Sequence, residues 1–145
     1  KTFKGWAIGA KRTNTDVMLA ICTPDDDRLV GSIGLHRIGT RQHHRSALLV
    51  NEIGYWLAES ARGRGMATRA LQVVSKWALE QPDITFVNLQ TKVGNAASQA
   101  VARAAGYQFV QLVPGTDVID DDTDHERFVL EARPAQLPRF SRSGP

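Results

Sequence analysis

The chain has 145 residues, 42% of them hydrophobic, and its 18 lysines and arginines against 15 aspartates and glutamates give a formal net charge of +3. That length and composition suit one globular domain with its own core. The basic excess is too small to indicate a nucleic-acid-binding protein, and no run of about 18 apolar residues predicts a membrane span.

The number of cysteines indicates the cellular compartment. Cys22 is the only cysteine, so the chain has neither an internal disulfide nor a cysteine zinc site. The opening stretch KTFKGWAIGA lacks a signal-peptide core. We therefore expect a protein of the reducing cytoplasm, a monomer or a homodimer, with no membrane or nucleic-acid partner.

The first part of the chain predicts a short helix and then a hairpin. In the segment 2–12, apolar residues recur at i, i+3, i+4 and i+7, although two glycines weaken the pattern. The segment 16–22 is rich in β-branched and apolar residues, and a TPDDDR turn separates it from the similar run 29–38. These two runs predict neighbouring strands.

A third strand is predicted at 48–59, after a polar loop. Its odd-numbered residues from Leu49 to Leu57 share one face, and its even-numbered residues from Val50 to Trp56 share the other. Glu52 is the only charged residue in this alternating run.

Two helices with a strand between them follow. The first is predicted at 65–80, before Pro82, the strand at 84–91, and the second helix at 96–106, which Gly106 ends. The predicted apolar stripe of the first helix consists of Met66, Ala70, Val73, Val74 and Trp77.

Two further strands are predicted at 107–113 and 125–132, on either side of an acidic loop, and the Pro-, Arg- and Ser-rich segment 134–145 is predicted to be a flexible tail. The order α-β-β-β-α-β-α-β-β predicts an α/β (α+β) domain over residues 1–133. We expect a mixed, mostly antiparallel sheet of about six strands with helices on both faces.

The corner between the third strand and the next helix is the most informative stretch. ESARGRGMATRA, residues 59–70, places two glycines and three arginines where a helix begins. The first turn of a helix leaves about four N–H groups without partners and carries a partial positive charge. Glycine admits an anion closely and arginine adds charge-assisted hydrogen bonds. The stretch predicts a phosphate cradle, although a polar surface connection would have a similar composition.

Two familiar phosphate loops do not account for this corner. No stretch contains the Walker pattern Gly-x-x-x-x-Gly-Lys-Ser/Thr. The segment 63–67 begins the dinucleotide fingerprint, but Thr68 stands where the third glycine belongs. Asp83 lies at a suitable distance downstream, yet it precedes a strand instead of ending one.

The stretch EIGYWLAESARGRGMATRAL, residues 52–71, resembles the acyl-coenzyme A signature of the GNAT superfamily of N-acetyltransferases. That signature, Gln/Arg-x-x-Gly-x-Gly/Ala, is met by Arg62, Gly65 and Ala67. IGYWL together with Asn-x-x-Ser at 95–98 resembles the RimJ/RimL-type branch, which includes ribosomal-protein N-terminal acetyltransferases. The resemblance covers about residues 16–133 and implies a twisted sheet with splayed central strands.

The resemblance implies acetyl-coenzyme A as cosubstrate and no metal. Amides of the cradle would hold its pyrophosphate, and the strand ahead of the cradle would pair with the pantetheine arm. Arg103 would reach a phosphate, although an exposed helix arginine has the same pattern. The implied cofactor-binding residues are Trp56, Leu57, Ala58, Arg62, Gly63, Arg64, Gly65, Met66, Ala67, Thr68, Asn95 and Arg103.

The implied chemistry is attack of an amine on a thioester, which needs a base and a group that stabilises the departing thiolate. Glu52 is the candidate base, acting through water, unless it is an ordinary strand carboxylate. Many relatives carry a tyrosine acid where this chain has Ala102, so Ser98 is the candidate partner of the thiolate. The alternative for Ser98 is capping of its helix. Tyr107 is expected in the core.

Other polar residues point less clearly to function. His43 and His44 are neighbours on a predicted loop, which does not favour a metal site. The acidic residues at 120–124 would attract a cationic amine or simply form a solvated loop. Family members usually begin with another strand and helix, which this chain is expected to lack.

The resulting hypothesis is an N-acetyltransferase that moves an acetyl group directly from acetyl-coenzyme A to a primary amine: a protein N-terminus, an amino acid or a small amine. Cys22 lies on an early strand far in sequence from the signature, which disfavours a covalent intermediate. A non-catalytic module that binds coenzyme A or its esters is the alternative, and a nucleotide-phosphate protein is a third possibility.

Overall fold

The structure is a computed structural model that describes residues 11–12, 16–36, 38, 50–82, 84–115 and 122–133. Most of the predicted helix at 2–12, the pair His43 and His44, part of the acidic loop and the predicted tail lie outside the described residues. Lys11 and Arg12, predicted as the end of that helix, instead form a short strand, because they pair with Met18 and Val17 at the edge of the sheet.

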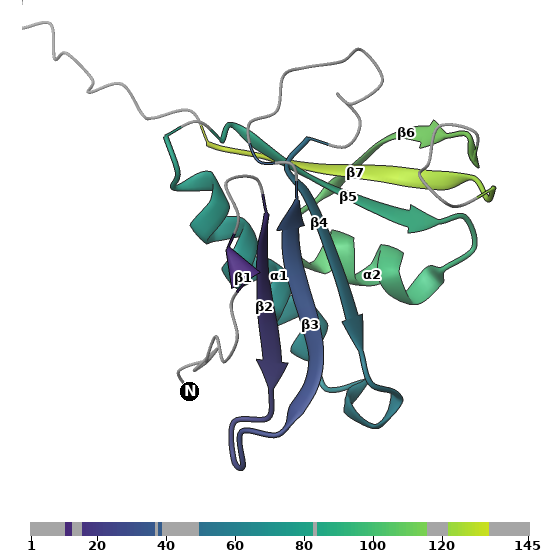
Figure 1. The fold of residues 1–145 in the computed structure, drawn as a ribbon. Coiled ribbons are helices and arrows are strands. Elements are labelled where there is room, and N and C mark those ends of the chain that lie inside the picture. Colours follow the sequence, from purple (N-terminus) through teal and green to yellow (C-terminus); the bar gives the residue numbers. More distant parts are fainter. Residues whose placement is uncertain are drawn as a thin grey trace, which may run out of the picture.

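The described strands form one sheet in the order β1-β2-β3-β4-β5-β7-β6 (Figure 1). Every neighbouring pair is antiparallel except β4 with β5, which is parallel, so the predicted mixed and mostly antiparallel sheet is confirmed. The strand bounds are β1 Lys11–Arg12, β2 Val17–Cys22, β3 Leu29–His36, β4 Glu52–Leu57, β5 Phe86–Lys92, β6 Gln108–Val113 and β7 His125–Glu131.

The helices of the described residues are the 3-10 turn η2, Glu59–Ala61, and the α-helices α1, Met66–Leu79, and α2, Ala96–Ala104. Both α-helices lie on the same face of the sheet (Figure 1). A helix on the second face stays a prediction, since the segment proposed for it is not described. Neither described α-helix is both long and apolar enough to cross a membrane.

The centre of the sheet opens between β4 and β5. Glu52 and Asn88 are their one registered pair, and beyond it the two strands diverge, as Figure 1 shows. The Asn88 N–H donates to the Asn51 carbonyl at 2.9 Å at this vertex. The predicted splay is therefore present, and it begins at Glu52.

The third strand starts later than predicted. The sequence pattern placed Asn51 within the strand, but it is a turn residue with φ of 54°. Its side-chain amide donates to the Phe86 carbonyl at 3.1 Å, so a tertiary hydrogen bond supports the left-handed conformation that asparagine tolerates. β4 consequently begins at Glu52.

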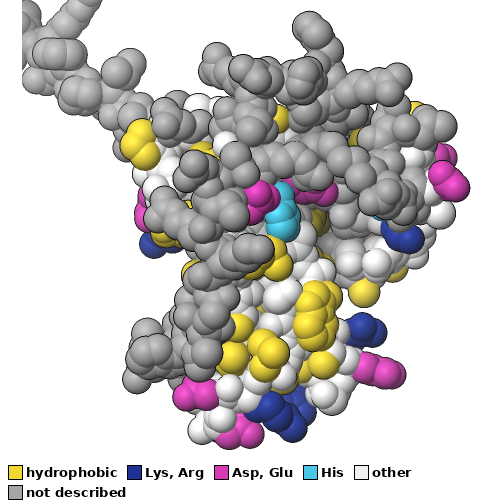
Figure 2. Space-filling model, viewed as in Figure 1, with side chains coloured by type: hydrophobic (Ala, Val, Ile, Leu, Met, Phe, Trp, Pro, Cys, Tyr) yellow, Lys and Arg dark blue, Asp and Glu magenta, His cyan; other side chains and the backbone are white. Residues whose placement is uncertain are grey.

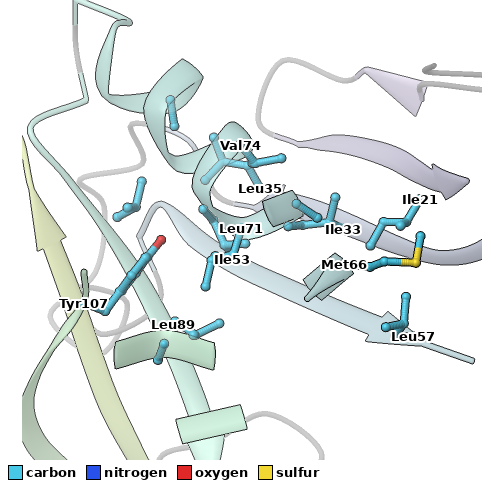
Figure 3. Packing of buried hydrophobic residues seen from close by; sticks show 14 of the residues in the cluster. Ile21, Ile33, Leu35, Ile53, Leu57, Met66, Leu71, Val74, Leu89 and Tyr107 are labelled. Atoms are coloured by element: carbon cyan, nitrogen blue, oxygen red, sulfur yellow. The ribbon is translucent and has the colours of Figure 1, made fainter. Parts of the chain in front are cut away.

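The core lies between the sheet and the two helices, and Figure 3 shows α1 packed over Ile33, Leu35 and Ile53. The buried face of α1 differs from the predicted stripe. Val73 and Trp77 are 48% and 36% exposed, whereas Leu71, Ser75 and Ala78, absent from that stripe, are buried. The face buried is the one made of Met66, Ala70, Leu71, Val74, Ser75 and Ala78.

Ser75 explains why the prediction missed this face. Its hydroxyl donates to the Leu71 carbonyl at 2.6 Å and lies 2.7 Å from the Tyr107 hydroxyl, so its polar group is satisfied inside the core. A hydrophobic pattern counts serine as polar and shifts the stripe towards Trp77. Tyr107 is itself 3% exposed, which confirms its predicted place in the core.

Candidate active site

The Gly/Arg corner presents its backbone to solvent. Gly63 and Gly65 have φ of 75° and 73°, in the left-handed region that favours glycine. A Cβ added to either residue would meet no atom within 4 Å, so the space beside both is open. Such openness is what a backbone needs if an anion is to approach it.

The start of α1 leaves amides for a ligand. Arg69 is the first residue whose N–H is bonded back into the helix, to the Gly65 carbonyl at 3.1 Å. The preceding N–H groups, those of residues 65–68, have no acceptor within the helix. They also carry the positive end of the helix dipole, so the corner is suited to an anion.

A cavity of about 470 Å³ extends from this corner into the opening between β4 and α2. Tyr55, Ala97 and Val101 complete its wall, and the predicted catalytic Ser98 lies in it. Most of the predicted cofactor-binding residues line it together: Trp56, Leu57, Arg62, Gly63, Gly65, Met66, Ala67, Thr68 and Asn95.

Three of the predicted cofactor-binding residues do not line the cavity, and each makes another contact. The Ala58 N–H donates to the Val30 carbonyl at 2.7 Å, so it extends the sheet. Arg64 is exposed, and its carbonyl accepts from Arg69 Nη2 at 3.0 Å. The Arg103 guanidinium, in the last turn of α2, lies 5.4 Å from the centroid of the Phe128 ring in a cation–π contact.

The strand β4 offers a different set of amides from the predicted one. Because Ala58 donates to β3, the amides of even-numbered residues, including Trp56, point towards β3. Those of Tyr55 and Leu57 point into the gap left by β5. Arg62 Nε donates to the Leu57 carbonyl at 3.0 Å, which leaves the Tyr55 amide and the Leu57 N–H facing the cavity.

The far wall of the cavity is the start of α2. Asn95 caps this helix, since its side-chain oxygen accepts from the Ser98 N–H at 3.2 Å. The capping role considered for Ser98 thus belongs to Asn95. The Ser98 hydroxyl instead accepts from the Tyr55 hydroxyl at 3.4 Å, across the cavity.

Tyr55 is a site residue that the sequence analysis missed. It shares its face of β4 with the buried Ile53 and Leu57, so alternation alone assigns it to the core. Its hydroxyl meets a serine 43 residues away, a proximity that only the folded sheet creates. The IGYWL motif was the one available signal.

Glu52 lies outside this cavity. On β4 it shares the opposite face with Gly54 and the exposed Trp56, and with Asp16, His36 and Gly54 it lines a separate hollow. Glu52 and Ser98 are therefore on opposite sides of the sheet, with the vertex of the β4/β5 opening beside Glu52. His36 was not singled out by the sequence analysis.

In the described part of the chain, no group of three or more His, Cys, Asp and Glu side chains gathers. Cys22 is buried on β2. What the geometry offers is an anion site at a helix start, strand amides beside it, and two hydroxyls at the inner end. An elongated ligand with a phosphate end and an amide-containing arm fits this arrangement.

Comparison with known proteins agrees with this geometry. YdaF of Bacillus subtilis (strain 168) is 35% identical over 82 residues, 57% of this chain and 42% of that protein. The ribosomal-protein-S5-alanine acetyltransferase of Vibrio fischeri superposes with a TM-score of 0.68 at 18% identity, covering 82% of this chain and 63% of that one.

A third similar structure contains a ligand. It is RimL, a ribosomal L7/L12 alpha-N-protein acetyltransferase in complex with coenzyme A, with a TM-score of 0.64 at 23% identity, covering 81% of this chain and 62% of that one. The chain spans about half the length of the curated relatives it matches, between 42% and 52%. The profile of the acetyltransferase (GNAT) domain matches residues 1–108. The chain therefore belongs to the GNAT acetyltransferase family.

Proposed function

We propose that this domain transfers an acetyl group from acetyl-coenzyme A directly to a primary amine. The observation that carries the proposal is the cavity that joins the open amides of the α1 start to the gap between β4 and β5. Family membership supports it, and so does the coenzyme A bound by a structure of the same fold.

The cavity suggests how the donor lies. The diphosphate meets the N–H groups of residues 65–68, and the arm runs along β4, where Tyr55 and Leu57 present amides. The thioester then reaches the hydroxyls of Ser98 and Tyr55. A hydroxyl near the sulfur stabilises the thiolate as it leaves, because hydrogen bonds to charged groups are stronger than those to neutral ones.

The proposed reaction is a direct displacement. The amine nitrogen attacks the thioester carbonyl, the C–N bond forms, the C–S bond breaks, and the nitrogen loses a proton. Glu52, at the vertex of the opening, takes that proton through water. Cys22 is the chain's only cysteine and is buried, so it is poorly placed to carry an acetyl group between donor and acceptor.

The acceptor is a protein N-terminus, an amino acid or a small amine. Protein N-termini receive support from the relatives, several of which are named for acetylation of ribosomal proteins. The cytoplasm, where ribosomes are assembled, is the proposed location. A monomeric or homodimeric state stays a prediction.

A non-catalytic module that binds coenzyme A is the second candidate. The observation in its favour is Ala102, a fully buried alanine at the position where many relatives carry a tyrosine acid. Both candidates bind acetyl-coenzyme A, so calorimetry with that ligand tests the cavity alone.

Thiol release separates the two candidates. The protein is mixed with acetyl-coenzyme A and a panel of ribosomal-protein N-terminal peptides, amino acids and small amines. An enzyme releases coenzyme A thiol in the presence of its acceptor, and the Glu52→Gln variant does so about 100-fold more slowly with the same donor affinity. Donor binding without amine-dependent thiol release would support the module instead.

A further inference from the structure

On the sheet face opposite α1 and α2, polar side chains form one row across the strands. His36 of β3 is the registered partner of Glu52 of β4, and Glu52 is the partner of Asn88 of β5. Asp16, just before β2, completes the row with its Oδ1 3.1 Å from His36 Nδ1. Figure 2 shows a histidine between acidic side chains on this face. Directly paired residues hold their Cβ atoms about 4.5 to 5.5 Å apart, so His36 and Glu52 are neighbours.

The contact with Asp16 sets the proton positions on the imidazole. An ionised carboxylate only accepts hydrogen bonds, so Nδ1 carries a proton and donates it to Asp16. In the neutral ring Nε2 then holds the free lone pair. The hydrogen bond to Asp16 therefore fixes both the orientation of the ring and the nitrogen that carries the proton.

The Nε2 atom lies over a glycine. A Cβ added to Gly34 would be 2.7 Å from His36 Nε2 and would also collide with Met18 Sδ, so the absence of a side chain at Gly34 lets the ring fold back along β3. The side chains of His36 and Asp16 are 33% and 37% exposed, which leaves the ring accessible to solvent and substrate.

A hollow lies next to His36. Gly34 and Gly54 are registered partners, and a Cβ on Gly54 would meet nothing within 4 Å. Asp16, His36, Glu52 and Gly54 line the hollow. Trp56, which is 55% exposed, follows Gly54 on the same face of β4.

The charges around the hollow favour an ammonium group. Asp16 and Glu52 contribute two carboxylates that line the hollow with His36, while Arg127 of β7 donates its Nε hydrogen bond to Asn88 Oδ1 at 2.6 Å and does not line the hollow. An amine substrate reaches the site mostly protonated and must lose one proton before it can attack. The hollow thus holds a group that attracts the cation and a second group that can take its proton.

We propose that His36, oriented by Asp16, accepts the proton of the incoming ammonium in the hollow over Gly54. This inference rests on the proposed acetyl transfer. His36 Nε2 takes the first proton and returns it to solvent, the neutral amine attacks the thioester carbonyl, and Glu52 takes the proton that nitrogen loses as the C–S bond breaks. The thiolate is protonated from solvent.

The test compares His36→Gln and Asp16→Asn with wild type, using kcat/KM for the acceptor amine across pH and calorimetric affinity for coenzyme A. If the base is an imidazole, kcat/KM rises with pH between about pH 5 and 8, and this rise is the limb of the pH profile. His36→Gln removes that limb and lowers kcat/KM about 100-fold, with coenzyme A affinity unchanged. Asp16→Asn lowers kcat/KM about 10-fold with coenzyme A affinity unchanged, because the ring loses the carboxylate that orients it.

Matched controls separate this role from general damage. Asp25→Asn, at an exposed turn, and His125→Gln, whose ring faces the Thr123 carbonyl, keep the wild-type limb. Gly54→Ala places a methyl group in the hollow and raises KM for the acceptor about 5-fold without changing coenzyme A affinity.

The outcomes are distinguishable. A His36→Gln enzyme with the wild-type pH profile and rate overturns the role of His36, and an unchanged acceptor KM in Gly54→Ala overturns the hollow as the amine site. Coenzyme A binding without thiol release by wild type, for every amine, overturns the proposed function and this inference with it. Loss of the limb in His36→Gln alone supports both.

Discussion

Two tyrosine–serine pairs in this molecule have the same chemistry and opposite surroundings. The Tyr107 and Ser75 hydroxyls lie 2.7 Å apart in the core, between α1 and the start of β6. The Tyr55 and Ser98 hydroxyls lie 3.4 Å apart at the wall of an open cavity, between β4 and α2. Each pair joins a helix to a neighbouring element.

The difference between the pairs is solvent access. Burial raises the pKa of Tyr107, so its hydroxyl stays neutral, and Ser75 also donates to the Leu71 carbonyl at 2.6 Å. That network is closed and has no place for a ligand. The longer contact between Tyr55 and Ser98 can open to admit a sulfur or carbonyl group. The same pair of residue types thus closes the core in one region and borders an open cavity in the other.

Gly65→Val is expected to have the largest effect of the variants, a loss of coenzyme A binding in the cavity. A branched side chain fills the space beside the α1 amides, and coenzyme A affinity falls at least about 100-fold by calorimetry, since several charge-assisted hydrogen bonds are lost together. Gly94→Val is the matched control, because Gly94 also has positive φ and open space but does not line the cavity. Equal affinity of the two variants would contradict the anion site.

Ser98→Ala tests the hydroxyl of the cavity pair. Loss of one hydrogen bond to the departing thiolate lowers kcat about 10-fold, while KM for the donor and the melting temperature stay near wild type. Ser60→Ala, an exposed serine in η2, serves as the control. A wild-type kcat for Ser98→Ala would remove this hydroxyl from the mechanism.

Tyr107→Phe tests the buried pair, where we expect a loss of stability and no loss of activity. The free energy of unfolding, measured by denaturant titration, falls by about 1 kcal/mol, because one buried hydrogen bond is lost while Ser75 keeps the Leu71 carbonyl. Thiol release per folded molecule stays unchanged. A large loss of kcat at full stability would show that the two pairs are not separate.

The smallest expected effect is a dependence on alkaline pH. The folded-state pKa of Tyr107 is raised above the value near 10 of an unfolded tyrosine, so the unfolded chain loses its proton first. The contribution of Tyr107 is therefore complete below about pH 10 and declines as pH rises further. Comparison of wild type and Tyr107→Phe by denaturant titration should show this decline only in wild type.

Local patterns predicted much of the fold. Alternation located the strands, and the helix at 65–80 was right within one residue at each end, because Gly65 and Pro82 punctuate the chain close to where α1 begins and ends. The errors arose where a tertiary contact overrode a local preference. Asn51 left the strand to reach Phe86, and Lys11 and Arg12 became an edge strand beside β2.

In the candidate site, too, features made by contiguous residues were predicted and contacts between distant residues were not. The open backbone of the glycine corner was predictable because Gly63, Gly65 and the helix start are contiguous, and contiguous residues set their own backbone geometry. Phosphate binding there stays a prediction. The contact of the Arg103 guanidinium with the Phe128 ring was not predicted, and a phosphate contact of Arg103 stays a prediction. Tyr55 and His36 were not predicted as site residues because their partners, Ser98 and Asp16, are distant in sequence.

By itself, the sequence determined the order of strands and helices, the glycine corner and the family to which they point. Only the tertiary structure decided that Ser98 and Glu52 lie on opposite faces of the sheet and that His36 stands between two carboxylates. The physical reason is range: backbone preferences act over a few residues, whereas strand register and the divergence of β4 from β5 depend on packing across the whole sheet.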